Sequence, residues 1–156
     1  MIGRKVKGVQ EERALDHVFG YFVANDVSAR DWQSHSPTVT MGKSFDTHGP
    51  IGPWIVTADE IPDPQNLGLL CLMNGDVRQD ARTSEMIFSV AEQITYLSTA
   101  FTLEPGDLIA TGTPEGVGAA MKPPRFLKAG DVVRCEVEKI GAIENRVAIR
   151  TRDQQG

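Results

Sequence analysis

Apolar and polar positions are grouped along this chain in short runs, a pattern typical of β-strands separated by turns. Residues 20–26 (GYFVAND) carry aromatic and β-branched side chains and end in Asn25 and Asp26, which predicts a buried strand running into a turn. Residues 54–57 (WIVT) predict another strand, and residues 107–111 (DLIAT) predict a buried strand that leads into a glycine-rich loop. We therefore expect strands to dominate the fold.

Two hairpins are predicted by turn residues that lie between strand-like runs. Residues 67–73 (LGLLCLM) are followed by an Asn-Gly dipeptide, which favours a type I′ turn, and then by DVRQDA. Residues 132–140 (VVRCEVEKI) alternate strictly and are joined through Gly141-Ala142 to ENRVAIR. The second pattern predicts a last hairpin near the end of the chain.

One substantial helix is predicted, over residues 89–101. Ser89 followed three residues later by Glu92 forms a capping box. Apolar side chains then recur at helical spacing, at Val90, Ile94, Leu97 and Phe101. With one helix and many strands, the sequence predicts a mainly β fold with minor α content.

The stretch 34–53 is polar, rich in glycine and proline, and without a sustained period. A stretch of that length in a compact domain is usually functional or mobile, so we predict a site loop here. Just before it, Ser28 is expected to cap the short turn ARDWQ. The histidines show no metal-ligand spacing, although His35 and His48, unlike His17, lie in the predicted site loop.

Composition narrows the class of protein. The length of 156 residues predicts a single domain over 1–156, with a loose tail at 151–156. No window approaches the roughly 20 apolar residues that span a bilayer, so no membrane segment is expected. The start, MIGRKVKG, is followed by the charged run QEER and not by an apolar segment, which favours a cytoplasmic protein. A net charge of −5 argues against a nucleic-acid partner and favours a small molecule.

The chain has two cysteines, Cys71 and Cys135, which lie far apart in the sequence. Each falls in an apolar run, and no CxxC pattern or Cys/His cluster accompanies either. We expect two buried free thiols and do not consider either a catalytic candidate.

Asp26 is the first candidate for chemistry, because a carboxylate at the end of an apolar strand is costly to bury without a partner. One interpretation is that Asn25, Asp26 and Ser28 cap the next turn. The other is that Asp26 shares a cavity with Arg30 and Gln33, which are three residues apart on one face of that turn. A carboxylate, a guanidinium and an amide suit a hydrated divalent cation and a ligand that bears a carboxylate.

Lys43 and Thr113 are further candidates. Lys43 follows a glycine in the predicted site loop, where a solvated surface lysine is the plain alternative. Thr113 lies in the loop ATGTPEGVG at residues 110–118, whose backbone amides and hydroxyl can bind an anion. The glycine spacing matches neither the P-loop nor the dinucleotide-binding pattern, and a simple glycine-rich turn is the alternative.

Taken together, these segments resemble the fumarylacetoacetate hydrolase family. YFVANDVSARDWQ, GKSFDTHGPIGPWIV, LMNGDVRQDART, MIFSVAEQITYLS and LEPGDLIATGTPEGVG occur in the order and spacing of that family. The resemblance covers nearly the whole chain and several separate motifs. It implies the family's mixed β-sandwich roll, a homodimer, and a site for Mg²⁺, Mn²⁺ or Ca²⁺.

The resemblance also implies roles for five residues, position by position. Asp26 matches the aspartate that binds the metal, and Arg30 and Gln33 match residues that contact the substrate. Lys43 matches the lysine beside the metal and the substrate oxygens, and Thr113 matches the threonine that binds a substrate carboxylate. Lys43 and Thr113 are therefore the expected catalytic residues.

One feature of the family has no counterpart in this sequence. A strand with the pattern ExE, whose two glutamates bind the metal, lies in the family a few residues upstream of the segment that here reads MIGRKVKG. A hard divalent cation takes about six oxygen ligands, so we expect one aspartate to hold it weakly. Glu11 and Glu12 are possible substitutes, although QEERALDHV has the pattern of a helical turn.

The resemblance implies a divalent-metal-dependent hydrolase, isomerase or decarboxylase that acts on 2-oxo or β-diketo carboxylic acids through an enolate. The breakdown of aromatic-ring-cleavage products is the expected setting. The alternative is an inactive domain that keeps the fold and binds a carboxylate weakly, and a plain structural β domain is a third class.

Overall fold

The computed structural model describes residues 1–149, and the tail predicted at 151–156 lies outside them. The strands are β1 (Gly20–Ala24), β2 (Ile51–Thr57), β3 (Gly68–Met73), β4 (Asp76–Arg82), β5 (Val132–Val137) and β6 (Gly141–Arg146). The helices are α1 (Glu11–Ala14), α2 (Arg30–Gln33) and α3 (Val90–Ala100), with 3₁₀ turns η1 (Leu15–His17), η2 (Thr40–Lys43), η3 (Thr83–Glu85) and η4 (Gly118–Ala120). The mainly β fold that the sequence predicts is confirmed.

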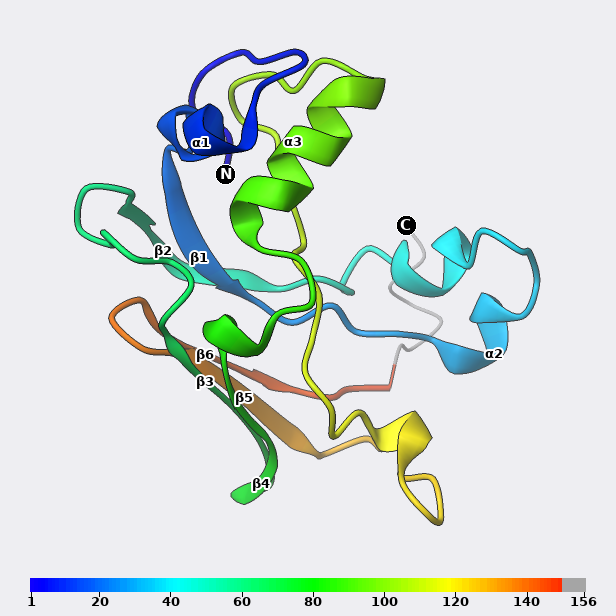
Figure 1. The fold of residues 1–156 in the computed structure, drawn as a ribbon. Helices are drawn as coiled ribbons and strands as arrows, with labels where there is room; N and C mark the ends of the chain where they lie inside the picture. The colour runs from blue at the N-terminus through cyan, green and yellow to red at the C-terminus, as the bar shows by residue number, and fades with distance from the viewer. Residues whose placement is uncertain (150–156) are drawn as a thin grey trace.

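The strands form two antiparallel sheets. β1 pairs with β2, and the larger sheet has the order β4-β3-β5-β6. Figure 1 shows α1 and α3 together at one end of the molecule and the four-stranded sheet at the other, with β1 and β2 between them. No helix among the described residues is long and apolar enough to cross a membrane.

Two groups of buried apolar side chains form the core. The first joins the N-terminal segment to α3 and contains Ile2, Val6, Ala14, Ile94 and Leu103. The second lies where β1 meets the four-stranded sheet and contains Val23, Ile61, Leu67 and Ile140. The two sheets therefore share one core, and α3 is fixed to the body mainly by the first group.

The hairpin of β3 and β4 has the predicted turn. Asn74 and Gly75 both have positive φ, at 54° and 88°, as a type I′ turn requires. The strand predicted at 54–57 is present too, although β2 begins earlier, at Ile51. The turn signal therefore places β3 and β4 side by side, as their pairing shows.

The turn of the last hairpin is displaced from its predicted position. We expected Gly141-Ala142 to join the strands, but the turn lies at residues 138–140, and Gly141 is the first residue of β6. Lys139 takes the left-handed conformation with a φ of 64°. Gly141 is required by its own backbone conformation instead, because its φ is 126°, and a Cβ there would also lie 3.1 Å from Cγ of Pro53.

The predicted strand at 107–111 is wrong, because that segment belongs to no strand in the described part of the chain. Separate hydrogen bonds hold it: Ile2 N donates to Asp107 O at 2.8 Å, and Gln93 Nε2 donates to Thr111 O at 3.3 Å. An apolar run becomes a strand only where a neighbouring strand supplies a ladder of partners. Residues 107–111 have no such neighbouring strand and lead into the glycine-rich loop as irregular backbone.

Helix α3 begins at the predicted capping box. Glu92 N donates to Ser89 Oγ at 3.0 Å, and Ser89 N donates to Glu92 Oε2 at 2.6 Å. Ile94 is 1% exposed in the first core group. The capping box therefore fixes where the apolar face of the helix begins, and so how α3 packs.

Replacing Ser89 by alanine removes the hydroxyl that accepts from Glu92 N. We expect Ser89→Ala to lower the free energy of unfolding by about 0.5–2 kcal/mol, measured by urea unfolding. Ser84→Ala is the matched control, because Ser84 is exposed in η3 and should change the free energy by less than about 0.5 kcal/mol. Equal effects of the two changes would contradict the role of the cap.

Candidate functional site

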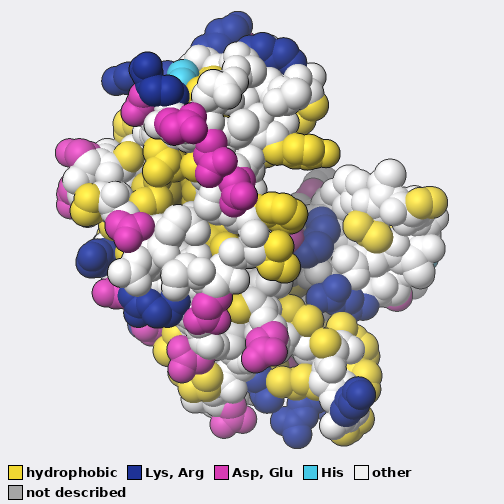
Figure 2. Space-filling model, in the orientation of Figure 1, with side chains coloured by type: hydrophobic (Ala, Val, Ile, Leu, Met, Phe, Trp, Pro, Cys, Tyr) yellow, Lys and Arg dark blue, Asp and Glu magenta, His cyan; other side chains and the backbone are white. Residues whose placement is uncertain are grey.

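A cavity of about 1190 Å³ lies between the turn after β1, the inner face of the four-stranded sheet and the segment 109–119. Figure 2 shows this region hollowed between the part that carries α2 and the body of the molecule, with basic side chains at the hollow. The basic residues among its lining are Arg30, Lys43, Arg78, Arg125 and Arg146. The lining therefore favours an anionic small molecule.

Asp26 and Lys43 meet at this cavity, although they are 17 residues apart. Lys43 Nζ lies 2.6 Å from Asp26 Oδ2 and donates also to Asp26 O at 3.3 Å. The side chains are 33% exposed for Lys43 and 54% exposed for Asp26, so the pair lies at the rim of the cavity. The alternative of a merely solvated lysine is therefore wrong.

Close packing of η2 on α2 places Lys43. Ala29 N donates to Gly42 O at 2.8 Å, and Gly42 is buried. A Cβ at Gly42 would lie 2.4 Å from Cγ of Gln33 and 3.0 Å from Ala29 O. A side chain at this position would push η2 away from α2, so the glycine before Lys43 is a requirement of the site.

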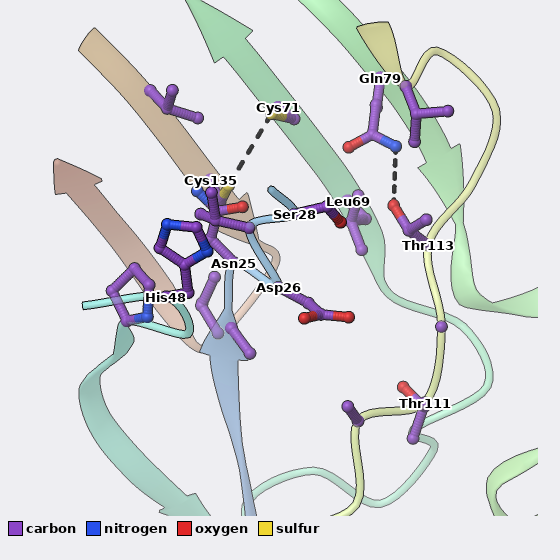
Figure 3. A pocket seen from close by; sticks show the side chains of 18 of the residues that line it. Asn25, Asp26, Ser28, His48, Leu69, Cys71, Gln79, Thr111, Thr113 and Cys135 are labelled. Atoms are coloured by element: carbon purple, nitrogen blue, oxygen red, sulfur yellow. Dashed lines mark hydrogen bonds between the residues drawn. The ribbon is translucent and has the colours of Figure 1, made fainter. Parts of the chain in front are cut away.

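The capping interpretation of the segment after β1 is also wrong. The residue at the N-cap of α2 is Ala29, and no side chain caps the helix. Ser28 Oγ is instead buried without a hydrogen-bond partner and lines the cavity, as does His48, whose Nδ1 is buried without a partner (Figure 3). Buried polar atoms normally have partners, so both atoms point to a ligand or water in this cavity.

Arg30 and Gln33 lie on one face of α2, as their spacing predicts. Arg30 Nη1 donates to Gln33 Oε1 at 2.9 Å. Arg30 lines the cavity, whereas Gln33 is not part of its lining. Gln33 therefore does not line the cavity itself but orients the guanidinium of Arg30, which does.

Thr113 is held at the cavity by a residue that the sequence did not indicate. Gln79 Nε2 donates to Thr113 Oγ1 at 2.7 Å and to Pro114 O at 2.9 Å (Figure 3). Because Thr113 Oγ1 accepts this bond, its own hydrogen is available for a ligand oxygen. Gly116 packs the loop onto β4, since a Cβ there would lie 1.9 Å from Arg78 O.

The two cysteines are free, as predicted, but they are only partly buried. Both line the cavity, and their sulfur atoms lie 3.8 Å apart. Sequence reasoning missed this pair because the two positions are 64 apart in the sequence, and only the strand register brings them into contact. The expectation of free thiols is therefore confirmed, whereas the expectation that both are buried is wrong.

The side chains described do not by themselves make a site for a hard divalent cation. No group of three or more His, Cys, Asp or Glu side chains suitable for a metal occurs among the described residues. Glu11 and Glu12 lie in the first turn of α1 and do not line the cavity, so they do not replace further carboxylates beside Asp26. The donor set beside Lys43 thus falls short of the roughly six oxygens such an ion takes.

A sequence profile described as fumarylacetoacetate (FAA) hydrolase C-terminal matches residues 1–148. The chain belongs to the fumarylacetoacetate hydrolase family. Among curated relatives, the mitochondrial oxaloacetate tautomerase fahd2 of Xenopus laevis is 54% identical over 149 residues, covering 94% of this chain and 47% of the relative. The chain thus spans about half the length of the curated relatives it matches.

Solved structures of the family have the same fold. Fumarylacetoacetate hydrolase from Exiguobacterium antarcticum superposes with a TM-score of 0.91 at 45% identity, over 96% of this chain and 54% of the other. Fumarylpyruvate hydrolase from Pseudomonas aeruginosa, solved in complex with Mn²⁺ and pyruvate, gives a TM-score of 0.85 at 34% identity, over 96% and 62%. The family's members thus include hydrolases and a tautomerase.

Gln79→Leu removes both hydrogen bonds that tie the Thr113 loop to β4. We expect peptides over residues 110–118 to exchange backbone hydrogen for deuterium at least about tenfold faster, because the loop opens without its anchor. Asp80→Asn on the same strand is the control and should leave this exchange unchanged. Unchanged exchange in Gln79→Leu would show that the loop is held by other contacts.

Proposed function

We propose that this chain contributes catalytic residues to an enzyme that acts on 2-oxo or β-diketo carboxylic acids through an enolate. The contact between Lys43 and Asp26, at a cavity that Thr113 also lines, carries the proposal. At this one site, the Lys43 ammonium can stabilise a developing enolate oxygen, and the Thr113 hydroxyl can bind a carboxylate.

Lys43 is assigned to the substrate oxo group. Its ammonium has three hydrogens, of which two are directed at Asp26 Oδ2 and Asp26 O. The third is available for the 2-oxo oxygen of a substrate, where it stabilises the negative charge that forms as the enolate appears. Asp26 holds the ammonium beside the cavity.

Thr113 and Arg30 are assigned to the acidic groups of the substrate. The Thr113 hydroxyl donates to one carboxylate, and the exposed amides of its loop add further donors. Arg30, oriented by Gln33, offers a planar pair of donors to a second carboxylate or oxo group. Such a set favours a short dicarboxylic or oxo-carboxylic acid over a neutral molecule.

The names of the relatives support this class of substrate. The Xenopus laevis relative is described as an oxaloacetate tautomerase, and oxaloacetate is a 2-oxo dicarboxylic acid. Pyruvate, bound in the Pseudomonas aeruginosa structure, is the smallest 2-oxo carboxylic acid. We infer that the same head group binds here. Breakdown of aromatic-ring-cleavage products by a homodimer is the setting that we propose.

A divalent cation in such a site would draw electrons from the oxo group. In this chain, Asp26 is the residue that would supply an oxygen ligand to the cation. Because one carboxylate is a poor donor set, we assign the chain's own chemistry to Lys43 and Thr113 and expect the cation to bind weakly.

Calorimetry with Mn²⁺ tests this assignment. We expect the chain to bind Mn²⁺ with a dissociation constant of about 10⁻⁴ M or weaker, and Asp26→Ala to abolish the binding. Adding a strand that carries ExE ahead of Met1 should make the binding tighter. Asp31→Ala is the control, since Asp31 also lines the cavity and is not assigned to the metal. Tight Mn²⁺ binding by this chain would disprove the weak site.

Catalysis is tested with oxaloacetate, whose keto and enol forms differ in ultraviolet absorbance. We expect Lys43→Met to lower the rate of interconversion about 10²-fold or more, because a preorganised donor to the enolate oxygen is lost. Lys5→Met is the matched control, as Lys5 forms a comparable ion pair with Glu104 at 2.7 Å but is not part of the cavity lining.

The alternative function is an inactive domain that keeps the fold and binds carboxylates. The donor set of one aspartate at the candidate metal position favours it. Oxalate binding without turnover of oxaloacetate, with and without Mn²⁺, would support this alternative over the enzyme.

A further inference from the structure

We propose that Cys71 and Cys135 form a dithiol modification site in the cavity wall, which hydroperoxides oxidise to an intramolecular disulfide. The proposal does not depend on the enzymatic function argued above, because it uses neither Asp26 nor Lys43. It rests on the strand register, on the distance between the sulfur atoms and on the charge beside Cys71.

The register brings the two thiols together on one face of the sheet. Cys71 of β3 lies directly opposite Cys135 of β5, and the sulfur atoms are 3.8 Å apart (Figure 3). Directly opposed residues of antiparallel strands have Cα atoms about 4.5–5.5 Å apart, within the range of about 4.4–6.8 Å that disulfides span. Side-chain rotation is thus enough to close the bond.

A β-bulge places a cation beside the pair. Gln79 is opposite Cys71 and Val77 is opposite Leu72, so Arg78 is the extra residue in β4. Successive residues of a regular strand face opposite sides of the sheet, but bulges redirect side chains, and here Arg78 and its neighbour Gln79 both line the cavity. The Arg78 side chain is only 16% exposed, and its Nε is buried without a partner.

The two thiols differ in acidity. The hydrogen bond that Cys135 donates lowers the pKa of Cys71 to about 7, and the positive charge of Arg78 acts in the same direction. The neighbouring Cys71 sulfur and burial raise the pKa of Cys135 well above its ordinary value. Cys71 is therefore the thiolate that reacts first with the peroxide, and Cys135 is the thiol that reacts second.

The oxidation is balanced with one hydroperoxide. Cys71 Sγ attacks a peroxide oxygen, the O–O bond breaks, and the leaving oxygen takes a proton, which leaves a sulfenic acid on Cys71. Cys135 Sγ then attacks the Cys71 sulfur, the S–O bond breaks, and water leaves with the proton of Cys135. Two thiols are oxidised, and one hydrogen peroxide is reduced to two waters.

The test uses the full chain, in which these are the two cysteines present. The reduced protein is treated with hydrogen peroxide, and free thiols and intact mass are followed without reductant. We expect both thiols to disappear together, with a monomer lighter by two hydrogen atoms and one peptide that joins position 71 to position 135. Oxygen addition without a cross-link, or disulfides only between chains, would overturn the proposal.

Single variants test the order of the two steps. In Cys135→Ser, Cys71 should form a sulfenic acid that dimedone traps, and in Cys71→Ser, Cys135 should react at least about tenfold more slowly. Cys71→Ala and Cys135→Ala repeat the comparison if a serine variant does not keep the circular dichroism of the parent. Equal rates at the two cysteines would overturn the assignment of Cys71.

A variant of the bulge tests the role of the cation. Arg78→Met should slow the oxidation of Cys71 several-fold, whereas Arg134→Met should not. Arg134 lies in β5, next to Cys135 in the sequence, and pairs with Glu136 and Glu144. No difference between the two variants would remove Arg78 from the proposed site.

Discussion

The register of β4, β3 and β5 is the constraint on which the cavity depends. It aligns Gln79, Cys71 and Cys135 in one row across the sheet, on the side that faces the cavity. From one end of this row, Gln79 holds the Thr113 loop, and the two cysteines occupy the positions beside it. A slip by one residue would turn the whole row to the opposite face and remove the anchor and the thiol pair together.

Features of the fold that depend on neighbours in the sequence could be predicted from it. The capping box of Ser89 and Glu92 and the turn at Asn74 act within a few residues, and both are present. The segment 107–111 has the apolar composition of a strand, but a strand also needs a partner, and composition does not supply one. Gly141 shows the same limit, because a glycine can serve a turn or a close approach with equal ease.

The residues of the candidate site also fall into those that a local motif indicates and those that depend on contacts between strands. Asp26, Lys43 and Thr113 were found because each lies in a recognisable motif, and the structure places all three at one cavity. Gln79 and the cysteine pair were missed because their roles come from cross-strand contacts, on strands whose order the sequence does not state. Arg78 is a further case, since only the bulge brings it to the same side as Gln79.

The exposure of the pair between Lys43 and Asp26 decides how the site can respond to a ligand. Half-exposed ion pairs contribute only about 0–1 kcal/mol, so separating the two charges costs little. Under the proposed function, a cation that binds Asp26 would displace only a weakly held ammonium, and Lys43 would remain beside the cavity. A buried pair would have locked both groups, because the charge left without a partner would be costly. The rim position therefore lets the pair of Asp26 and Lys43 separate at low cost when a ligand binds either group.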